Sequence, residues 1–227
     1  MDILILFEDA EALVIDKPTG LPIDRPRAGG PCLDDHLDAL KLGFQRSPVA
    51  VHRLDQDTSG CLLLARNPKA LKRFAAAFEE RQVEKVYLGI VAGEIEDDEG
   101  CISLALSKIS SAQKGWRMIP ARKGKPATTL WRKVATVGPL TLVEFRPETG
   151  RTHQIRVHAA SGLGTPLLGD PIYGDGASAS RTMLHARSLE VPREGKPSIV
   201  AKSPLPADFL ALGFSDEEFG NEAGSDG

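Results

Sequence analysis

The chain has 227 residues, of which 41% are hydrophobic and 26% charged. This ordinary globular composition excludes collagen-like and wholly disordered classes. No apolar run approaches the roughly 20 residues that a membrane helix needs, and the first residues lack the features of a secretory signal. We therefore expect no membrane association and a cytoplasmic location. The three cysteines form no C-x-x-C pair, which favours reduced thiols over disulfides or a zinc site.

The charge is unevenly distributed along the chain. The formal net charge of -3 does not by itself indicate a nucleic-acid binder. Residues 108–133, however, contain eight basic side chains and no acidic one, namely Lys108, Lys114, Arg117, Arg122, Lys123, Lys125, Arg132 and Lys133. Clustered basic side chains bind phosphates without regard to base sequence, so this basic stretch predicts either an RNA-tracking surface or a solvated loop.

The first part of the chain predicts short strands and turns. Apolar runs at 4–7 and 12–15 predict two strands, and residues 17–22 form a turn rich in proline and glycine. In residues 34–44, apolar side chains recur near the spacing of a helix.

A polar insert and a helix follow. Strands are predicted at 49–54 and 61–65, on either side of the polar residues 55–60. Asn67 followed by Pro68 is typical of a helix start, and it precedes an apolar face formed by Leu71, Phe74, Ala75 and Phe78. We expect an amphipathic helix there.

The second half predicts mainly strands. These are expected at 86–92, 102–106, 128–136, 140–145 and 183–191. Gly138-Pro139 predicts a hairpin, and a helix is expected over 152–161, where it is ended by Gly162. Strands in runs rather than in alternation with helices indicate an α+β fold with a mixed, largely antiparallel sheet and flanking helices. We expect one folded domain over 1–213 and an acidic, disordered tail over 214–227.

A dense polar segment, Val51-His52-Arg53-Leu54-Asp55-Gln56-Asp57-Thr58-Ser59-Gly60, lies between two predicted strands. A simple turn explains residues 57–60, because short polar side chains bond to nearby backbone groups. It does not explain His52 and Arg53, because a charged residue within an apolar strand is costly unless it reaches solvent or a partner. We therefore expect a functional site at this strand end.

A second polar segment is Glu148-Thr149-Gly150-Arg151-Thr152-His153-Gln154-Ile155-Arg156-Val157-His158. Arg151 at the expected helix start opposes the helix dipole, which suggests that it pairs with a carboxylate or a ligand phosphate. His153 and His158 are five residues apart and lack the spacing of a helical zinc pair, so we expect no metal site.

These segments resemble the RluA family of RNA pseudouridine synthases. The resemblance rests on His52-Arg53-Leu54-Asp55 with Thr58-Ser59-Gly60, on Gly150 to His158, and on Gly169-Asp170-Pro171-Ile172-Tyr173-Gly174. It extends from Glu8 and Lys17-Pro18-Thr19-Gly20-Leu21, through Glu84-Lys85-Val86-Tyr87 and Gly93-Glu94, to Leu184-His185-Ala186 and Pro204-Leu205-Pro206. The match implies a catalytic domain without the S4-type RNA-binding extension of many relatives.

The resemblance implies roles for four residues around a target uridine held in a cleft of the sheet. Asp55 would be the essential carboxylate, with Arg151 as its partner. Arg53 would enter the base stack as the target base leaves it, and Tyr87 would stack on the flipped base. Asp55 must then be ionised, either to attack C1′ or to take a proton from C2′, and both routes stay open.

Four further residues are expected to contact the substrate, namely His52, Lys85, Ile155 and Leu184. Ile155 and Leu184 would form apolar walls, because a detached uracil must be kept in a closed pocket. The reaction implies RNA as partner and no metal or redox cofactor. Transfer RNA and large-subunit ribosomal RNA are both possible substrates, and we expect a monomer.

Three other readings of the same residues are open. Asp55 and Asp57 could be the acid and base of a glycosidase, although a spacing of two residues in a turn makes opposed geometry difficult. The basic stretch could belong to a non-catalytic RNA-binding module. Ser59 with His52 could form a nucleophile pair, but the Gly-x-Ser-x-Gly elbow is absent.

Overall fold

The structure is a computed structural model that describes residues 3–111, 113 and 115–216. The chain divides into two compact units. The first unit comprises the residues up to Lys85 together with Ala186–Ser203, and the second comprises Val86–His185 and the residues from Pro204 onward. None of the described helices is long and apolar enough to span a membrane.

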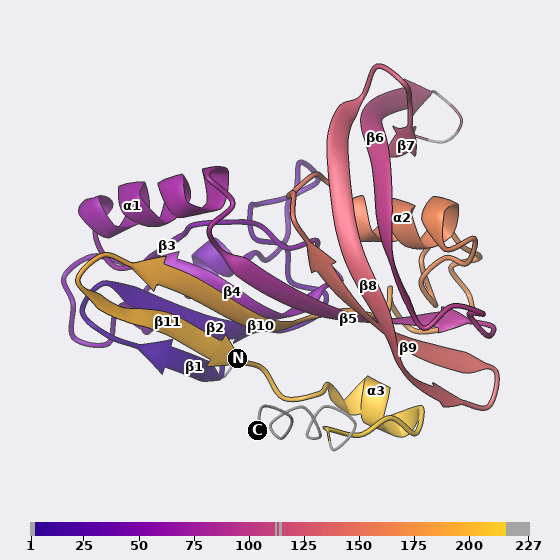
Figure 1. Cartoon of the computed structure of the whole chain (residues 1–227). Coiled ribbons are helices and arrows are strands. Elements are labelled where there is room, and N and C mark those ends of the chain that lie inside the picture. Colours follow the sequence, from indigo (N-terminus) through magenta and orange to yellow (C-terminus); the bar gives the residue numbers. More distant parts are fainter. Residues whose placement is uncertain (1–2, 112, 114, 217–227) are drawn as a thin grey trace, which may run out of the picture. The chain divides into compact units, whose positions relative to one another are not determined.

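The first unit is a sheet covered by one long helix (Figure 1). Its strands are β1 (Ile5–Glu8), β2 (Ala12–Lys17), β3 (Val49–Ala50), β4 (Ser59–Ala65), most of β10 (Leu184–Arg193), and β11 (Lys196–Lys202). The order is β1-β2-β4-β10, with β3 on β4 and β11 on β10. The pairs β1/β2, β2/β4, β3/β4 and β10/β11 are antiparallel.

The helix of this unit, α1 (Pro68–Glu79), confirms the sequence prediction. Asn67 Oδ1 accepts a hydrogen bond from the Ala70 N–H at 2.8 Å, and Pro68 takes the first helical position, where its missing N–H costs nothing. Phe74 is buried, and it packs with Val14 and Leu63 of the sheet in one apolar cluster. The apolar face of the helix therefore covers β2 and β4, the second of which begins at the end of the polar loop 51–58.

Two predictions for this unit are wrong. Residues 34–44 form no long helix but two short 3₁₀ helices, Leu33–His36 and Ala39–Lys41, followed by Leu42 in the left-handed region at φ 46°. The segment is short and rich in aspartate, so a full α-helix has little local stability there. The strand predicted over 49–54 ends at Ala50, which places His52 and Arg53 on a loop rather than inside a strand.

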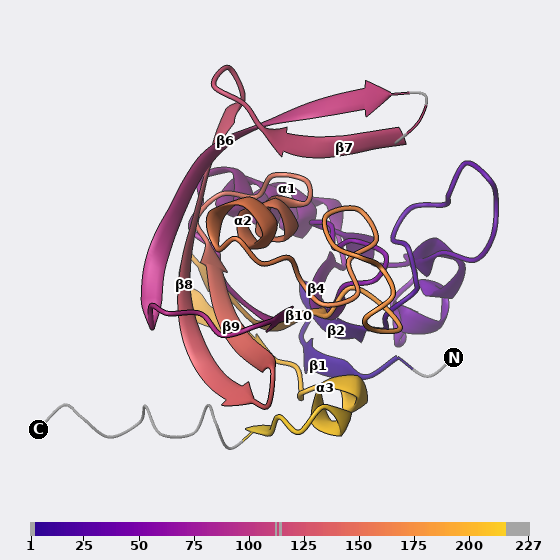
Figure 2. The ribbon, with the colours of Figure 1, turned by 90° about the vertical axis from the view of Figure 1, so that its right-hand side faces the viewer.

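The second unit is a strongly curved antiparallel sheet with a helix on each face (Figures 1 and 2). Its strands are β5 (Glu84–Ala92), β6 (Glu99–Ser111), β7 (Gly115–Pro120), β8 (Lys125–Val137) and β9 (Leu140–Pro147), in the order β5-β9-β8-β6-β7. The helices are α2 (Gln154–Gly162) and α3 (Ala207–Ala211). Both the α+β class and the largely antiparallel sheet of the sequence prediction are confirmed.

The two faces of this sheet bury different clusters. Val143 and Phe145 of β9 pack with Ile155 and Ala159 of α2 on one side. Leu142 of β9, which points to the other side, packs with Phe209 of α3 and with Phe214. Because side chains alternate along a strand, β9 contributes residues to the apolar cores on both faces of the sheet.

Several boundaries differ from the sequence prediction. Strands β7 and β11 and helix α3 were not expected, whereas the hairpin at Gly138-Pro139 is confirmed. Helix α2 begins at Gln154 instead of residue 152. Phe214, assigned to the tail from the sequence, is only 2% exposed, so the packed part of the chain extends beyond residue 213. Residues 217–227 of the expected tail lie outside the described part.

Candidate active site

Asp55 lies on the loop between β3 and β4, in the first unit. The loop closes on itself through a hydrogen bond from the Thr58 N–H to the Asp55 carbonyl oxygen at 3.1 Å. Thr58 and Ser59 are buried at its base, whereas Asp55 is half-buried. The turn predicted for residues 57–60 therefore fixes the backbone beside the carboxylate.

A fully buried lysine, Lys17, fastens this loop to the turn after β2. Its ammonium donates three hydrogen bonds to backbone carbonyl oxygens, those of Pro18 (2.8 Å), Leu21 (2.9 Å) and Gln56 (3.0 Å). Thr19 Oγ1 adds a fourth link, to the Asp57 carbonyl oxygen at 2.9 Å. The sequence motif around Lys17 belongs to the resemblance, but sequence reasoning gave this residue no role.

Arg53 presents its guanidinium to solvent. Its side chain is 78% exposed and pairs with Asp24, itself 63% exposed, at 3.1 Å. An ion pair this open contributes at most about 1 kcal/mol, so Arg53 can leave it at little cost. This is the exposure that a side chain entering a base stack requires.

His52 is held as a neutral ring. The Leu63 N–H donates to its Nε2 at 3.0 Å, so Nδ1 carries the proton. Its ring stacks on Phe78 at a centroid distance of 4.6 Å. Burial, assisted by the positive charge of Lys85, lowers the pKa of His52 to about 3. His52 is therefore unsuited to carry a proton near neutral pH.

Lys85 completes this group in the first unit. Its ammonium donates to the Val83 carbonyl oxygen at 3.1 Å and lies 5.9 Å from the centroid of Phe78. Burial lowers the pKa of Lys85. The structure thus brings His52 and Lys85 together around one phenylalanine of α1.

Arg151 lies in the second unit, on the loop that leads into α2. It precedes the helix by three residues, so the expectation that it opposes a helix dipole from within the first turn is wrong. Its N–H donates to Gln154 Oε1 at 3.0 Å, and its Nε donates to the Pro126 carbonyl oxygen at 3.3 Å. The backbone of Arg151 is therefore held by the first residue of the helix.

Gln154 is buried, and both the oxygen and the nitrogen of its side-chain amide form hydrogen bonds. Its Oε1 accepts from Thr149 Oγ1 at 2.7 Å in addition to the Arg151 N–H. Its Nε2 donates to the Thr128 carbonyl oxygen and to Thr129 Oγ1, both at 2.9 Å. All four hydrogen-bonding positions of the amide are thus occupied, which fixes the loop carrying Arg151 to β8.

Tyr87, Ile155 and Leu184 meet in one apolar cluster of the second unit. Ile155 and Leu184 are 5% and 4% exposed, and Tyr87 on β5 is half-buried and packs against the same cluster. The eight predicted site residues thus form two sets: His52, Arg53, Asp55 and Lys85 in the first unit, and Tyr87, Arg151, Ile155 and Leu184 in the second.

A charged network that the sequence reasoning did not assign lies beside Arg151. Arg156 and Asp170, both buried, form a two-pronged ion pair at 2.7 and 2.8 Å. The Arg156 guanidinium also donates to His153 Nε2 at 3.1 Å, so His153 Nδ1 carries a proton and donates to Tyr173 Oη at 3.0 Å. These residues lie within the sequence motifs that carry the family resemblance, and those motifs are the feature of the sequence that could have indicated them.

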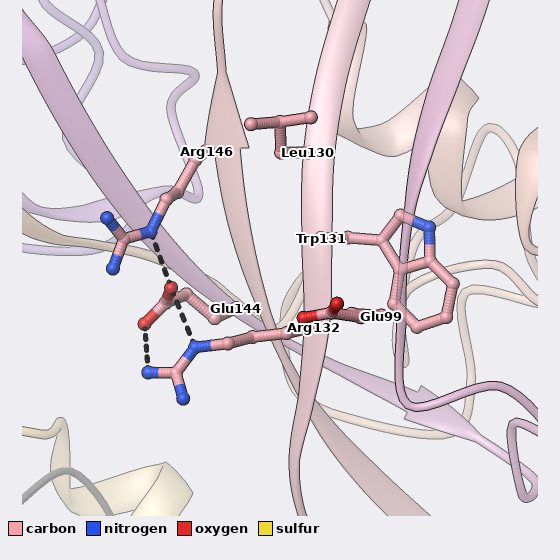
Figure 3. Close-up of a pocket in the computed structure, with 6 residues that line it drawn as sticks. All are labelled: Glu99, Leu130, Trp131, Arg132, Glu144 and Arg146. Carbon is pink, nitrogen blue, oxygen red and sulfur yellow. Dashed lines mark hydrogen bonds and ion pairs between the residues drawn. The ribbon is translucent and has the colours of Figure 1, made fainter. Parts of the chain in front are cut away.

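A pocket elsewhere in the second unit contains none of the predicted residues. It has a volume of about 270 Å³ and is lined by Glu99, Leu130, Trp131, Arg132, Glu144 and Arg146 (Figure 3). Arg132 and Arg146 both bond to Glu144 and keep the pKa of this carboxyl below its usual value, against the opposing effect of its burial. Its arginines and glutamates balance, so it is not a basic surface.

Comparisons with known proteins identify the family. Residues 11–161 match the family model described as RNA pseudouridylate synthase, a range that includes parts of both units. The chain belongs to this family. Its members isomerise uridine in RNA, so the chain is an RNA-modifying isomerase.

Similar proteins cover most of the chain. An uncharacterized RNA pseudouridine synthase of Zymomonas mobilis is 54% identical over 92% of this chain and 97% of its own length. Ribosomal large subunit pseudouridine synthase D of Nitrosomonas europaea is 38% identical over 92% of this chain, which spans 63% of that relative. Among solved structures, human RNA pseudouridylate synthase domain containing 4 aligns with a TM-score of 0.76 at 27% identity, covering 92% of this chain and 91% of the other.

Proposed function

We propose that Asp55 is the essential carboxylate with which this synthase converts specific uridines of structured RNA to pseudouridine. The observation that carries the proposal is the fastening of its loop: Lys17 and Thr19 hold the backbone at Gln56 and Asp57. A side chain on a loop so held keeps one position relative to a bound nucleotide, which is what catalysis by a single carboxylate requires.

The chemistry needs an ionised carboxylate and no redox partner. The N1–C1′ bond of uridine breaks, the uracil turns, and a C5–C1′ bond forms, while C5 loses a proton and N1 gains one. Atoms and electrons balance within the substrate. Asp55 either attacks C1′ or removes the C2′ proton at the start, and both roles require its charged form.

Arg151 is the proposed partner of Asp55. A guanidinium favours the ionised form of a carboxylate and fixes its orientation through a planar pair of donors. Gln154 holds the backbone of Arg151. The hydrogen bond from the Arg151 Nε to the Pro126 carbonyl oxygen is long and weak, so Arg151 can exchange it for a bond to a carboxylate or a phosphate.

Arg53 and Tyr87 are the proposed base-flipping residues. Removing a base from its stack costs a few kcal/mol, and stacking on an aromatic side chain returns about 1–3 kcal/mol. The exposed Arg53 would fill the space that the base leaves, and Tyr87 would receive the base. Ile155 and Leu184 would close the pocket behind Tyr87, while His52 and Lys85 would support the RNA side of the Asp55 loop.

The substrate, assembly and location are proposed at a coarser level. The rRNA-modifying relative favours large-subunit ribosomal RNA, and transfer RNA is the second candidate. We propose a cytoplasmic location, because Cys32, Cys61 and Cys101 are thiols outside any disulfide, as expected in a reducing compartment. We also propose that the protein is a monomer. Light scattering after size exclusion gives the assembly, and mapping pseudouridines in RNA from cells with and without the protein identifies the target.

The test of the proposed function is Asp55→Asn with Asp57→Asn as its matched control. Asp55→Asn keeps the size of the side chain and removes its charge, so RNA should bind with unchanged affinity while turnover falls by roughly a thousandfold or more. Asp57→Asn alters the neighbouring carboxylate of the same turn and should retain turnover. Arg151→Lys should also lower turnover, because an ammonium lacks the planar pair of donors.

Product analysis separates the alternatives independently of the variants. Treated RNA should keep its mass, gain a C-linked uridine and release no uracil. A glycosidase would release one uracil per event and leave an abasic site, and a binding module would leave the RNA unchanged. Stoichiometric free uracil, or full turnover by Asp55→Asn, would overturn the assignment.

A further inference from the structure

One exposed aromatic ring in the second unit has no place in the proposed reaction. Trp116 on β7 is 44% exposed, whereas Trp131, the other tryptophan of the chain, is 8% exposed. A large exposed indole is unusual on a surface that serves only solubility. The hairpin of β6 and β7 that carries it projects past α2 (Figure 2).

Trp116 lies next to the loop of Arg151. The ring of His153, two residues after Arg151, is tilted by 35° against the indole with a centroid distance of 4.9 Å. Lys108 on β6, which pairs with Met118 and so lies diagonally across from Trp116, places its ammonium 4.9 Å from the indole centroid. The aromatic surface therefore combines an indole, a neighbouring imidazole and a cation, which are the groups that bind single-stranded nucleotides.

The surface is held in place rather than mobile. Tyr173 Oη accepts hydrogen bonds from the Met118 N–H and from His153 Nδ1, each at 3.0 Å. Met118 is two residues after Trp116 on the same face of β7, and its side chain packs against the same small apolar cluster as Tyr173. Tyr173 thus links the strand of Trp116 to the start of α2. A ring fixed in this way loses little conformational freedom when a base stacks on it.

The charge around Trp116 favours a polyanion. The described basic side chains of the hairpin and its connection are Lys108, Arg117, Arg122, Lys123 and Lys125, and the sequence from 108 to 133 contains no acidic residue. Four of these five are exposed, all but Arg117. A protein partner of mixed charge would not need such a surface, whereas an RNA strand would.

We propose that Trp116 is a stacking platform for an unpaired RNA base outside the catalytic pocket. The ammonium of Lys108 moves from the indole to the phosphate of the same nucleotide. The platform selects RNA whose target uridine has an unpaired neighbour, because a base within a duplex does not present its face. The inference rests on the proposed function only in taking RNA as the ligand.

Intrinsic fluorescence tests the platform directly. In Trp131→Phe, Trp116 is the only tryptophan. We expect an RNA hairpin with an unpaired loop to quench its fluorescence and a blunt duplex of equal length to quench it much less. Equal quenching by both RNAs, or no quenching by either, would overturn the proposal, and the latter would leave a protein partner as the occupant of this ring.

Affinity measurements provide a second, independent test in the otherwise unaltered full chain. Trp116→Ala should weaken binding of the hairpin RNA roughly 5- to 100-fold, whereas Trp116→Phe should restore most of the affinity. The salt dependence should not change in Trp116→Ala, but Lys108→Gln should reduce its slope by about one charge. Leu130→Ala, an equally exposed apolar side chain on β8, is the matched control and should bind as the wild type does.

The outcomes separate this proposal from the proposed function. Fluorescence and affinity require binding alone, so they are measured equally well in the Asp55→Asn background. A protein with Asp55 intact that makes no pseudouridine but shows Trp116 quenching by unpaired RNA contradicts the proposed function and supports the platform. Wild-type affinity in Trp116→Ala, together with normal pseudouridine formation, contradicts only the platform.

Discussion

Lys17 shows how one buried charge organises the catalytic loop. A buried ammonium is very costly unless it is fully hydrogen-bonded, and here three backbone carbonyls surround it. Two of the carbonyls belong to the turn after β2. The third belongs to Gln56, which follows Lys17 by 39 residues. The three hydrogen bonds therefore offset the desolvation cost of the ammonium, and they fix the position of the loop that carries Asp55.

His52 makes the stability of the fold depend on pH. Its folded-state pKa of about 3 is below the ordinary value of 6.5, so the folded protein binds fewer protons than the unfolded chain between these values. The stabilisation is complete above pH 6.5 and is lost as pH falls toward the folded pKa. His52→Gln cannot titrate and should lack this contribution, while its amide oxygen still accepts from the Leu63 N–H.

The measurement is urea unfolding of wild type and His52→Gln over a pH series. The wild type should lose stability relative to the variant by about 1 kcal/mol per pH unit between about pH 6 and pH 4. His158, whose pKa burial lowers to about 4, contributes equally to both proteins and cancels in the difference. A difference that stays constant with pH would show that His52 has the same pKa in the folded and the unfolded chain, and would contradict this expectation.

At the level of helices and strands, local signals predicted some elements and missed others for physical reasons. The pair Asn67-Pro68 supplies a cap and a first turn, so the start of α1 is predicted correctly from the sequence. Strand β7 was missed because Arg117 and the surrounding basic residues read as a solvated loop. Only its pairing with β6, in which Ile109 faces Arg117, and its contact with Tyr173 reveal that Trp116 and Met118 share one face of a strand.

The start of α2 gives a prediction about how an element positions a side chain. Gln154→Leu keeps the approximate volume but removes all four hydrogen bonds of the amide. It should lower the free energy of unfolding by about 2–3 kcal/mol, because the Thr128 carbonyl and the buried Thr129 hydroxyl each lose one of their hydrogen bonds. It should also lower kcat while leaving the KM for RNA nearly unchanged, because Arg151 loses the bond that fixes its backbone.

Steady-state kinetics at a temperature where both proteins are folded tests this expectation. Gln154→Glu is the control, because its carboxylate oxygens still accept from the Arg151 N–H and from Thr149 while losing the two donated bonds. Partial recovery of kcat in Gln154→Glu, compared with Gln154→Leu, would assign the effect to the Arg151 bond. Equal kcat in both variants would show that the Arg151 bond does not affect turnover and that Gln154 contributes only to stability.

Across the whole molecule, the sequence motifs name candidate site residues but not the contacts that hold them in place. The motifs named Asp55, Arg53, Tyr87 and Arg151, but the fastening by Lys17 and Gln154 depends on contacts between residues that are distant in sequence and was not readable from spacing. The same limit applies to the division of the chain. Two of the three borders between the units fall inside β5 and β10, where no change of composition marks them, and the third lies between β11 and α3.

The C-terminal border of the packed chain gives the last prediction. Phe214 lies with Phe209 and Leu205 in the core of the second unit, and Asp216 accepts a hydrogen bond from the Leu205 N–H at 3.3 Å. A chain that ends at residue 216 should therefore unfold at the wild-type temperature and retain turnover. A chain that ends at residue 213 loses a buried aromatic ring and should be destabilised by about 3 kcal/mol or more. Thermal unfolding of the pair, with Phe214→Ala in the full chain as control, checks this expectation. Equal stability of the two truncated chains would show that the ring contributes nothing and that the packed chain ends at residue 213, as composition alone suggested.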